Sequence, residues 1–371
     1  MSECGVKEFK LRELLKIYNG TKYDHLNKGD IPLYGSGGLM SHVNEALYSG
    51  EAILLPRKGT LSNIMYVNES FWTVDTMYYA VVNDKLADAF YLYSYLSQLD
   101  LSNLDSGSTL PSMTKSAYES IVVKLPDLKI QKAVATILFN IRKKLEINNQ
   151  INQELEAMAK TLYDYWFVQF DFPDQNGNPY KSSGGKMVYH PELKREIPEG
   201  WGVAKVEDIA QTGSGGTPKS TNVSYYSNGE IPWINSGELE QTVITSTSNF
   251  ITEEGLNNSS AKLFPSGTIL VAMYGATAGK VSFLTFEAST NQAICAIMLN
   301  DIRMRYYLKN VIEDLYQYLV KLSTGSARDN LSQDMIKNIK VVIPSNDILD
   351  RHYDFSNNII KEITKKQQEN E

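Results

Sequence analysis

The sequence is poor in the residues that build disulfide frameworks and metal clusters. Its 371 residues include two cysteines, Cys4 and Cys295, and four histidines. So few thiols and imidazoles disfavour both a disulfide framework and zinc ligation. No apolar run approaches the ~20 residues of a membrane span, and the opening MSECGVKEFK lacks the basic-then-apolar order of a signal peptide. We therefore expect a reduced, cytoplasmic protein without a metal site.

An excess of positive charge is also missing. The formal net charge is −7, which argues mildly against nucleic acid as a partner because phosphate contacts come from lysine and arginine. A nucleic-acid-binding protein needs only a local basic face, however, and partner subunits can supply further phosphate contacts. The charge therefore does not exclude DNA.

Common catalytic patterns are absent. The segment GSGGTPKS (213–220) looks like a phosphate-binding loop, but Pro218 stands where that loop needs a glycine N–H. The segment GATAGKV (275–281) ends in Val281, which has no hydroxyl for a magnesium ion. No G-x-S-x-G elbow occurs, and the four histidines show no suggestive spacing. The sequence thus disfavours nucleotide hydrolysis and nucleophilic catalysis.

One enzymatic alternative stays open between residues 173 and 194. Asp174, Glu192 and Lys194 follow the acidic-pair-plus-lysine order of magnesium-dependent nucleases. The segment between them is turn-like, so surface charges in a linker are the favoured interpretation, and a self-contained nuclease is the alternative. Asn178-Pro179-Tyr180 resembles part of an amino-methyltransferase motif but lacks its second proline. We do not expect this chain to bind S-adenosylmethionine.

The chain contains two copies of one domain. The segments GDIPLYGSG and GEIPWINSG share five of nine residues at an offset of 200. Two further pairs follow in the same order at offsets of 216 and 218. The aligned segments are 29–37 with 229–237, 52–60 with 268–276, and 106–126 with 324–344. Slowly growing offsets indicate a duplicated domain whose second copy carries loop insertions.

Each copy is expected to combine strands with helices. We predict strands at 52–55, 77–82, 268–273 and 293–299, and an aromatic-bearing helix in each copy at 86–99 and 303–322. A long amphipathic helix then follows each copy, at about 130–170 and 347–368. The second helix ends in polar residues, and we expect that end to fray.

The two long helices are predicted to pack against each other in antiparallel orientation. Their apolar residues follow heptad-like spacing, interrupted in the first helix by Asn148, Asn149 and Asn152. The predicted contact residues, which would also serve partner subunits, are Val134, Leu138, Ile141, Leu145, Leu155, Leu162 and Trp166 in the first helix and Phe355, Ile359 and Ile363 in the second.

The predicted fold class is mixed α/β (α+β), with two tandem domains separated by an antiparallel coiled-coil pair of long helices. The first domain would cover 1–126 and the second 205–344. The first helix would occupy 127–170, a linker 171–204 and the second helix 345–371.

These features resemble the specificity subunit of type I restriction–modification systems. The resemblance rests on the tandem copies, the helix after each copy, the repeat-end segments at 106–126 and 324–344, and the linker WFVQFDFPDQNGNPYKSSGGKMVYHPELKREIPEGW. It implies two target-recognition domains that each read half of a bipartite, asymmetric DNA sequence. It also implies two methyltransferase subunits and restriction/translocase subunits as partners. S-adenosylmethionine, ATP and magnesium would then act on those partners, and this chain would be non-catalytic, without a cofactor.

Loops of both copies supply the predicted DNA contacts. Arginine suits guanine and asparagine suits adenine in the major groove, whereas isolated lysines suit phosphates. The predicted base readers are Arg57, Asn235, Arg328 and Asn330, and the predicted phosphate contacts are Lys58, Lys219 and Lys280. Further predicted contacts are Tyr34, Ser36, Ser108, Thr109, Lys115, Thr217, Ser236, Tyr274, Thr277 and Ser326.

Overall fold

A computed structural model describes residues 5–101, 111–275, 277–322 and 331–371, with the backbone alone at 318–322. The chain forms two compact units, Met1–Lys144 and Leu145–Glu371, and each is described by itself. The division falls within the helix α4 (Leu128–Tyr163), so each unit contains part of that helix. Among the described helices, none is both long and apolar enough to cross a membrane.

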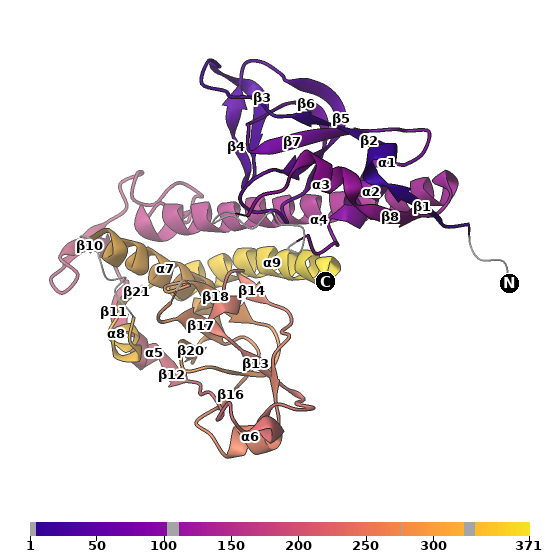
Figure 1. Ribbon diagram of the computed structural model, residues 1–371. Helices are drawn as coiled ribbons and strands as arrows, with labels where there is room; N and C mark the ends of the chain where they lie inside the picture. The colour runs from indigo at the N-terminus through magenta and orange to yellow at the C-terminus, as the bar shows by residue number, and fades with distance from the viewer. Residues whose placement is uncertain (1–4, 102–110, 276, 323–330) are drawn as a thin grey trace. The chain divides into compact units, whose positions relative to one another are not determined.

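Unit 1 is built on a mixed sheet with short helices (Figure 1). The strand order is β2 (Leu15–Asn19), β7 (Met77–Val82), β5 (Tyr48–Pro56), β6 (Met65–Thr73), β3 (Lys28–Gly35) and β4 (Gly38–Val43). The strands β1 (Lys7–Lys10) and β8 (Val122–Leu125) pair separately, and the helices are α1 (Leu11–Leu14), α2 (Ala89–Leu96) and α3 (Lys115–Ser120). Residues 52–55 of β5 are fully buried, as their continuous apolar run requires.

The described residues of unit 2 form two larger sheets, two separate strand pairs and several helices. One sheet has the order β12 (Ala210–Ser214), β20 (Ile294–Leu299), β17 (Ile269–Ala272), β18 (Val281–Leu284) and β14 (Val243–Ile244). The other has β15 (Phe250–Ile251), β13 (Ile231–Ile234), β19 (Ala288–Thr290) and β16 (Leu263–Phe264). The strands β11 (Gly202–Lys205) and β21 (Lys340–Ile343) pair separately, and the helices are α5 (Val206–Ile209), α6 (Glu253–Asn257), α7 (Arg305–Leu322), α8 (Gln333–Lys337) and α9 (Asn346–Asn370).

The duplication extends to strand register. In unit 1, β3 runs parallel to β6 and pairs Leu33 with Trp72. In unit 2, β13 runs parallel to β19 and pairs Trp233 with Ser289. Leu33 and Trp233 are equivalent residues in the sequence alignment, so the same unusual parallel pairing occurs at the same position of each copy.

The start and end of each copy are joined in the same way. The Leu11 N–H donates to the Ile121 carbonyl at 2.9 Å, and the Val206 N–H donates to the Ile339 carbonyl at 3.0 Å. Just outside these contacts, β1 pairs antiparallel with β8 and β11 with β21. Each copy is therefore closed by its first and last strands. The predicted mixed α/β fold with two tandem domains is confirmed.

Within unit 2, the second half of α4 packs antiparallel against α9. Asn148 lies beside Asn370, whereas Trp166 lies beside His352, with ring centroids 6.0 Å apart. Trp166, Ile359 and Ile363 are buried, and Leu155 and Leu162 are half-buried against the same core. The predicted apolar contact therefore forms over this part of the two helices.

The polar interruptions of the stripe are part of this contact. Asn148 is buried and donates to Asn370 Oδ1 at 2.8 Å, while the Asn370 amide donates to Asn149 Oδ1 at 3.0 Å. Gln367 donates to the Val243 carbonyl at 2.9 Å. The expectation that the end of α9 frays is therefore wrong, because its polar side chains are bound by polar groups of unit 2.

Three residues of the predicted stripe are not buried within this chain. Leu138, Ile141 and Phe355 are 37%, 52% and 42% exposed, and Val134 and Leu145 are half-buried. In unit 1, α4 uses another face: Gln131 and Ala135 are buried, and Phe139 packs against Phe90 of α2 with centroids 5.2 Å apart. A helix that packs on its domain with one face leaves neighbouring faces open to solvent.

The linker between the two copies contains regular secondary structure and buried aromatic side chains. It contains a hairpin of β9 (Met187–His190) and β10 (Arg195–Pro198), and the ring of Phe172 stacks on those of Tyr180 and Trp201 at 4.6 and 4.9 Å. These aromatics join the core of unit 2, so the linker is an ordered part of that unit.

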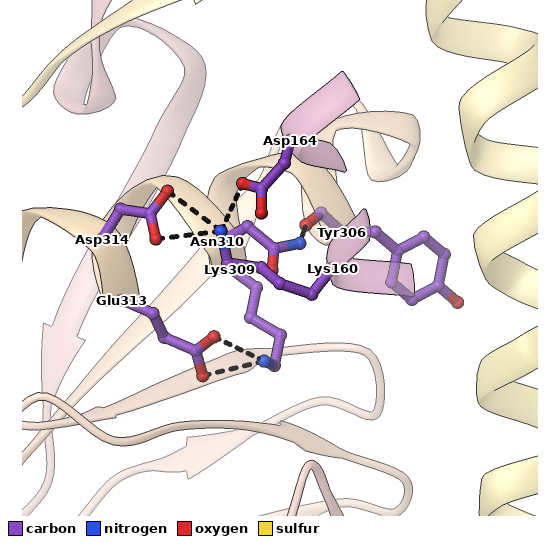
Figure 2. A network of polar contacts seen from close by, with 7 residues as sticks. All are labelled: Lys160, Asp164, Tyr306, Lys309, Asn310, Glu313 and Asp314. Carbon is purple, nitrogen blue, oxygen red and sulfur yellow. Dashed lines mark hydrogen bonds and ion pairs between the residues drawn. The ribbon is translucent and has the colours of Figure 1, made fainter. Parts of the chain in front are cut away.

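An ion pair joins α7 to α4 in unit 2 (Figure 2). Lys160 of α4 contacts Asp164, and its Nζ lies 3.2 Å from Asp314 Oδ1 of α7. Within α7, Lys309 Nζ lies 2.7 Å from Oε1 of Glu313, which is one helical turn after Lys309. Each lysine of this network is neutralised by a carboxylate.

Candidate nucleic-acid interface

Three loops of unit 1 are joined by hydrogen bonds. The Ser36–Gly37 turn joins β3 to β4, residues 57–63 follow β5, and residues 111–114 precede α3. Asn63 donates to the Ser36 carbonyl at 2.9 Å, and the Met113 N–H donates to the Arg57 carbonyl at 2.9 Å. These contacts bring together the loops that carry Ser36, Arg57 and Lys58, with Lys115 directly after the third loop.

The basic residues of these loops are exposed. Arg57 donates to the Asp75 carbonyl at 3.3 Å, and its guanidinium lies 6.0 Å from the centroid of the Tyr78 ring. Within the described part of the chain, neither Arg57 nor Lys58 forms an ion pair. A neutral carbonyl and a ring orient the guanidinium without neutralising it, so its charge remains available for a ligand.

Tyr34 is held differently. Its hydroxyl donates to Glu69 Oε1 at 3.0 Å, and burial together with Glu69 raises the pKa of Tyr34 to about 12. The phenol therefore stays protonated, and its donor is occupied within unit 1. Its hydroxyl is thus already bonded to a carboxylate, unlike the side chains of Arg57 and Lys58, which make no ion pair among the described residues.

Unit 2 assembles the equivalent loops with other side chains. The Thr277 hydroxyl donates to the Ser236 carbonyl at 2.8 Å, in the place of the Asn63–Ser36 contact. The Leu331 N–H donates to the Met273 carbonyl at 2.7 Å, in the place of the Met113–Arg57 contact. Met273 is buried where unit 1 has the exposed Arg57. The two clusters thus share a backbone frame but present different side chains.

This arrangement corrects the prediction that Thr277 contacts DNA. Only 7% of the residue is exposed, and its hydroxyl is used inside the cluster. It supports the Ser236 loop and does not face a ligand. Tyr274 is 37% exposed, and Lys280, three residues beyond Thr277, is also exposed.

The glycines of GSGGTPKS serve close packing. A Cβ on Gly215 would lie 2.0 Å from the Thr290 carbonyl oxygen, and one on Gly216 would lie 2.2 Å from Ser260 Oγ. The Gly216 N–H donates to the Thr290 carbonyl at 2.9 Å. Glycine is therefore required at both positions by close packing within unit 2. The exposed Lys219 stays a candidate, whereas the Thr217 hydroxyl donates to Gln292.

Asn235 and Gln292 form an amide-bearing surface beside this loop. Asn291 donates to Asn235 Oδ1 at 3.3 Å, and the Trp233 indole donates to the Gly216 carbonyl at 3.0 Å, which joins the two segments. Gln292 is exposed and was missed in the sequence. Gln292 lies just before β20, as Thr76 lies just before β7. Because the Thr76 carbonyl accepts from the backbone N–H groups of Arg57 and Lys58, the equivalent position in the second copy could have been recognised as part of the cluster.

Five predicted contacts lie outside the described residues. They are Ser108 and Thr109 of unit 1 and Ser326, Arg328 and Asn330 of unit 2.

The residues of the nuclease alternative are separated and have structural roles. Asp174 Oδ1 accepts from the backbone N–H groups of Asn176 and Asn178 at 2.7 and 2.9 Å. Glu192 lies in the β9–β10 turn and pairs with Lys340 at 3.1 Å, and Lys194 occupies a turn position with φ +50°. Nothing in this arrangement supports the nuclease.

Comparison with known proteins defines the class. The family model described as "Type I restriction modification DNA specificity domain" matches residues 3–157 and again 198–371. Because the matches cover most of the chain, the protein belongs to the family of type I restriction–modification specificity subunits. The predicted resemblance is confirmed.

Particular relatives agree with this assignment. The chain is similar to the type I restriction enzyme MjaIX specificity subunit of Methanocaldococcus jannaschii, with 26% identity over 72% of this chain and 61% of the relative. It is similar to the HindI specificity subunit of Haemophilus influenzae, with 25% identity over 65% of this chain and 63% of the relative. The chain thus spans about three fifths of the length of these relatives. The fold resembles the S subunit from M. genitalium, with a TM-score of 0.68 at 12% identity, over 100% of this chain and 93% of that one.

Proposed function

We propose that this chain reads a two-part DNA sequence, with each unit contacting one part through its loop cluster. The observation that carries the proposal is the pair of clusters with matching backbone contacts and different exposed side chains. A shared frame places the two reading surfaces equivalently, and different side chains give the two half-sites different sequences. The recognised sequence is therefore asymmetric.

The exposed side chains divide into two roles. Arg57 in unit 1 suits guanine because a guanidinium can donate twice to O6 and N7. The half-buried Asn235 and the exposed Gln292 in unit 2 suit adenine, because an amide both donates and accepts. Each amide oxygen accepts one hydrogen bond within unit 2 and keeps a second lone pair. Lys58 and Lys219 suit phosphates as exposed cations. Ser36 and Ser236 mark the turns that bring these residues to the duplex.

The chemistry is assigned to partner subunits. Methyl transfer would belong to two methyltransferase subunits, and cleavage to restriction/translocase subunits, with S-adenosylmethionine, ATP and magnesium on those partners. This chain would be non-catalytic and would choose the DNA site at which they act. The printed names of the relatives, specificity subunits of type I restriction enzymes, support this division.

A domain exchange tests the proposal. Residues 205–340 are replaced by the corresponding segment of another specificity subunit, and the chimera is expressed with its cognate methyltransferase subunit. Methylome sequencing should then show one half-site changed and the other retained, because unit 1 is untouched. The reciprocal exchange of residues 1–126 is the matched control and should change the other half. A change of both half-sites in either chimera would contradict separate reading.

A further inference from the structure

A cavity with a mainly apolar lining and a cationic rim lies in unit 2, away from the loop clusters. It has a volume of about 290 Å³ and lies between the beginning of α7, the middle of α9 and the edge of the β14-containing sheet. Its apolar lining includes Val243, Phe283 and Ile360. None of the predicted DNA-contacting residues lines it.

Three cations surround this cavity. They are Arg305 of α7 and Lys361 and Lys365 of α9, and no aspartate or glutamate is among the lining residues. Lys361 and Lys365 are exposed and make no ion pair within the part of the chain that the structure describes. They are four residues apart on one helix face, so their charges repel each other. The surplus charge is local, in a chain whose net charge is −7.

Arg305 is positioned by neutral groups. Its Nη2 donates to Asn357 Oδ1 at 2.7 Å, and its guanidinium lies 4.5 Å from the centroid of the Tyr306 ring and 5.4 Å from that of Tyr353. Its Nε is buried, with no hydrogen-bond partner within the described residues. An arginine that is oriented but not neutralised is typical of anion recognition.

The adjacent, larger cavity of unit 2 lacks this imbalance. It has a volume of about 450 Å³, and its lining includes Lys160 and Lys309. The carboxylates shown in Figure 2 neutralise both lysines, and Glu156 and Glu240 add negative charge to the lining. The smaller cavity is therefore the one whose electrostatics select an anion.

We propose that the cavity lined by Arg305, Lys361 and Lys365 binds a phosphate group. Three cations from two helices match the several acceptor oxygens of a tetrahedral phosphate. The hydroxyl groups of Ser266, Thr285 and Thr364 each donate to a backbone carbonyl. The three cations are therefore the side chains that would bind the phosphate. The phosphate could belong to a DNA phosphodiester or to a free phosphomonoester or inorganic phosphate. The site goes beyond the proposed reading of bases.

Calorimetric titration of the full chain with inorganic phosphate tests the proposal. We expect saturable binding that weakens at least tenfold in the double variant Lys361→Gln/Lys365→Gln. The control Lys129→Gln/Lys132→Gln removes two exposed charges from α4 and should bind as the wild type does. Both lysines of the cavity are exposed, and unchanged melting temperatures would show that the variants fold. No saturable binding, or equal loss in both double variants, would overturn the phosphate site.

A duplex titration separates the two sources of phosphate. If the source is DNA, a 30-base-pair duplex should compete with inorganic phosphate, and the cavity variant should lower the salt dependence of duplex binding by about two ions. If the source is a free phosphate, methyl phosphate should compete while duplex binding stays unchanged. Both results support the site. Because phosphate binding is measured without DNA, its outcome is independent of the proposed sequence reading.

Discussion

The buried His352 should make unit 2 sensitive to acid. No part of the residue is exposed, and its ring lies 4.7 Å from that of Phe167 and 6.0 Å from that of Trp166. Its Nε2 lies 3.4 Å from Ser356 Oγ, and its Nδ1 has no partner within the described residues. Burial lowers the pKa of His352 from 6.5 to about 4. The folded protein therefore holds a neutral imidazole.

The size and direction of the effect follow from proton linkage. Between pH 6.5 and 4 the unfolded chain binds a proton at this site that the folded chain does not, so stability falls as pH falls through this range. The two pKa values give a loss of about 2.4 kcal/mol in the free energy of unfolding between pH 7.0 and 4.5. That is a substantial part of the ~5–15 kcal/mol that stabilises an ordinary domain.

Urea unfolding at the two pH values, followed by tryptophan fluorescence, measures this loss. In His352→Leu the pH-dependent decrease should be about 2.4 kcal/mol smaller than in the wild type, because no proton is bound there on unfolding. The variant His42→Gln, at an exposed histidine of β4, is the control and should lose as much stability as the wild type. If His352→Leu shows the same decrease as the wild type, the linkage argument is wrong.

Three further predictions follow from the contacts described above. Gly215→Ala should destabilise unit 2 by about 1–3 kcal/mol, because the new Cβ would lie 2.0 Å from the Thr290 carbonyl oxygen. Gly237→Ala is the control and should not change stability, because a Cβ there would have nothing within 4 Å. Thermal melting of the two variants compares them. Asn370→Ala should cost about 1–3 kcal/mol in chemical denaturation, because the buried Asn148 loses its acceptor at 2.8 Å and keeps only the longer contact of 3.5 Å to Glu369 among the described residues. A cost equal to that of Glu362→Ala, at an exposed position, would contradict this. Arg57→Ala should relax one base position at a cost of about 1–3 kcal/mol, while Lys58→Ala should weaken all duplexes alike; binding to a randomised library distinguishes these outcomes.

The repeat architecture could be predicted because duplication leaves a direct record in the sequence. The alignment of residues 29–37 with 229–237 made Leu33 and Trp233 equivalent, and the structure places both in parallel strand pairs, which the sequence analysis did not predict. The repeat-end alignment anticipated that Thr114 and Ser332 would be equivalent, and each caps its helix by accepting from the N–H three residues on. Such features depend on local sequence and therefore survive in both copies.

The exposure of individual site residues could not be predicted. Thr277 and Gly215 have the composition of a surface loop, yet both are buried by segments distant in the sequence. Leu138 and Ile141 have the spacing of a buried stripe, yet α4 turns a different face to its own domain. Asn148 looked like an interruption because its partner, Asn370, lies more than two hundred residues away. These outcomes depend on tertiary contacts, which periodicity does not report.

The pairing of the outer strands in each copy has a consequence for the exchange of a copy. Because β1 lies beside β8 and β11 beside β21, the chain enters and leaves each copy at adjacent positions. An exchange of the whole segment between these paired strands for that of a related chain would therefore leave the path of the polypeptide into and out of the copy unchanged.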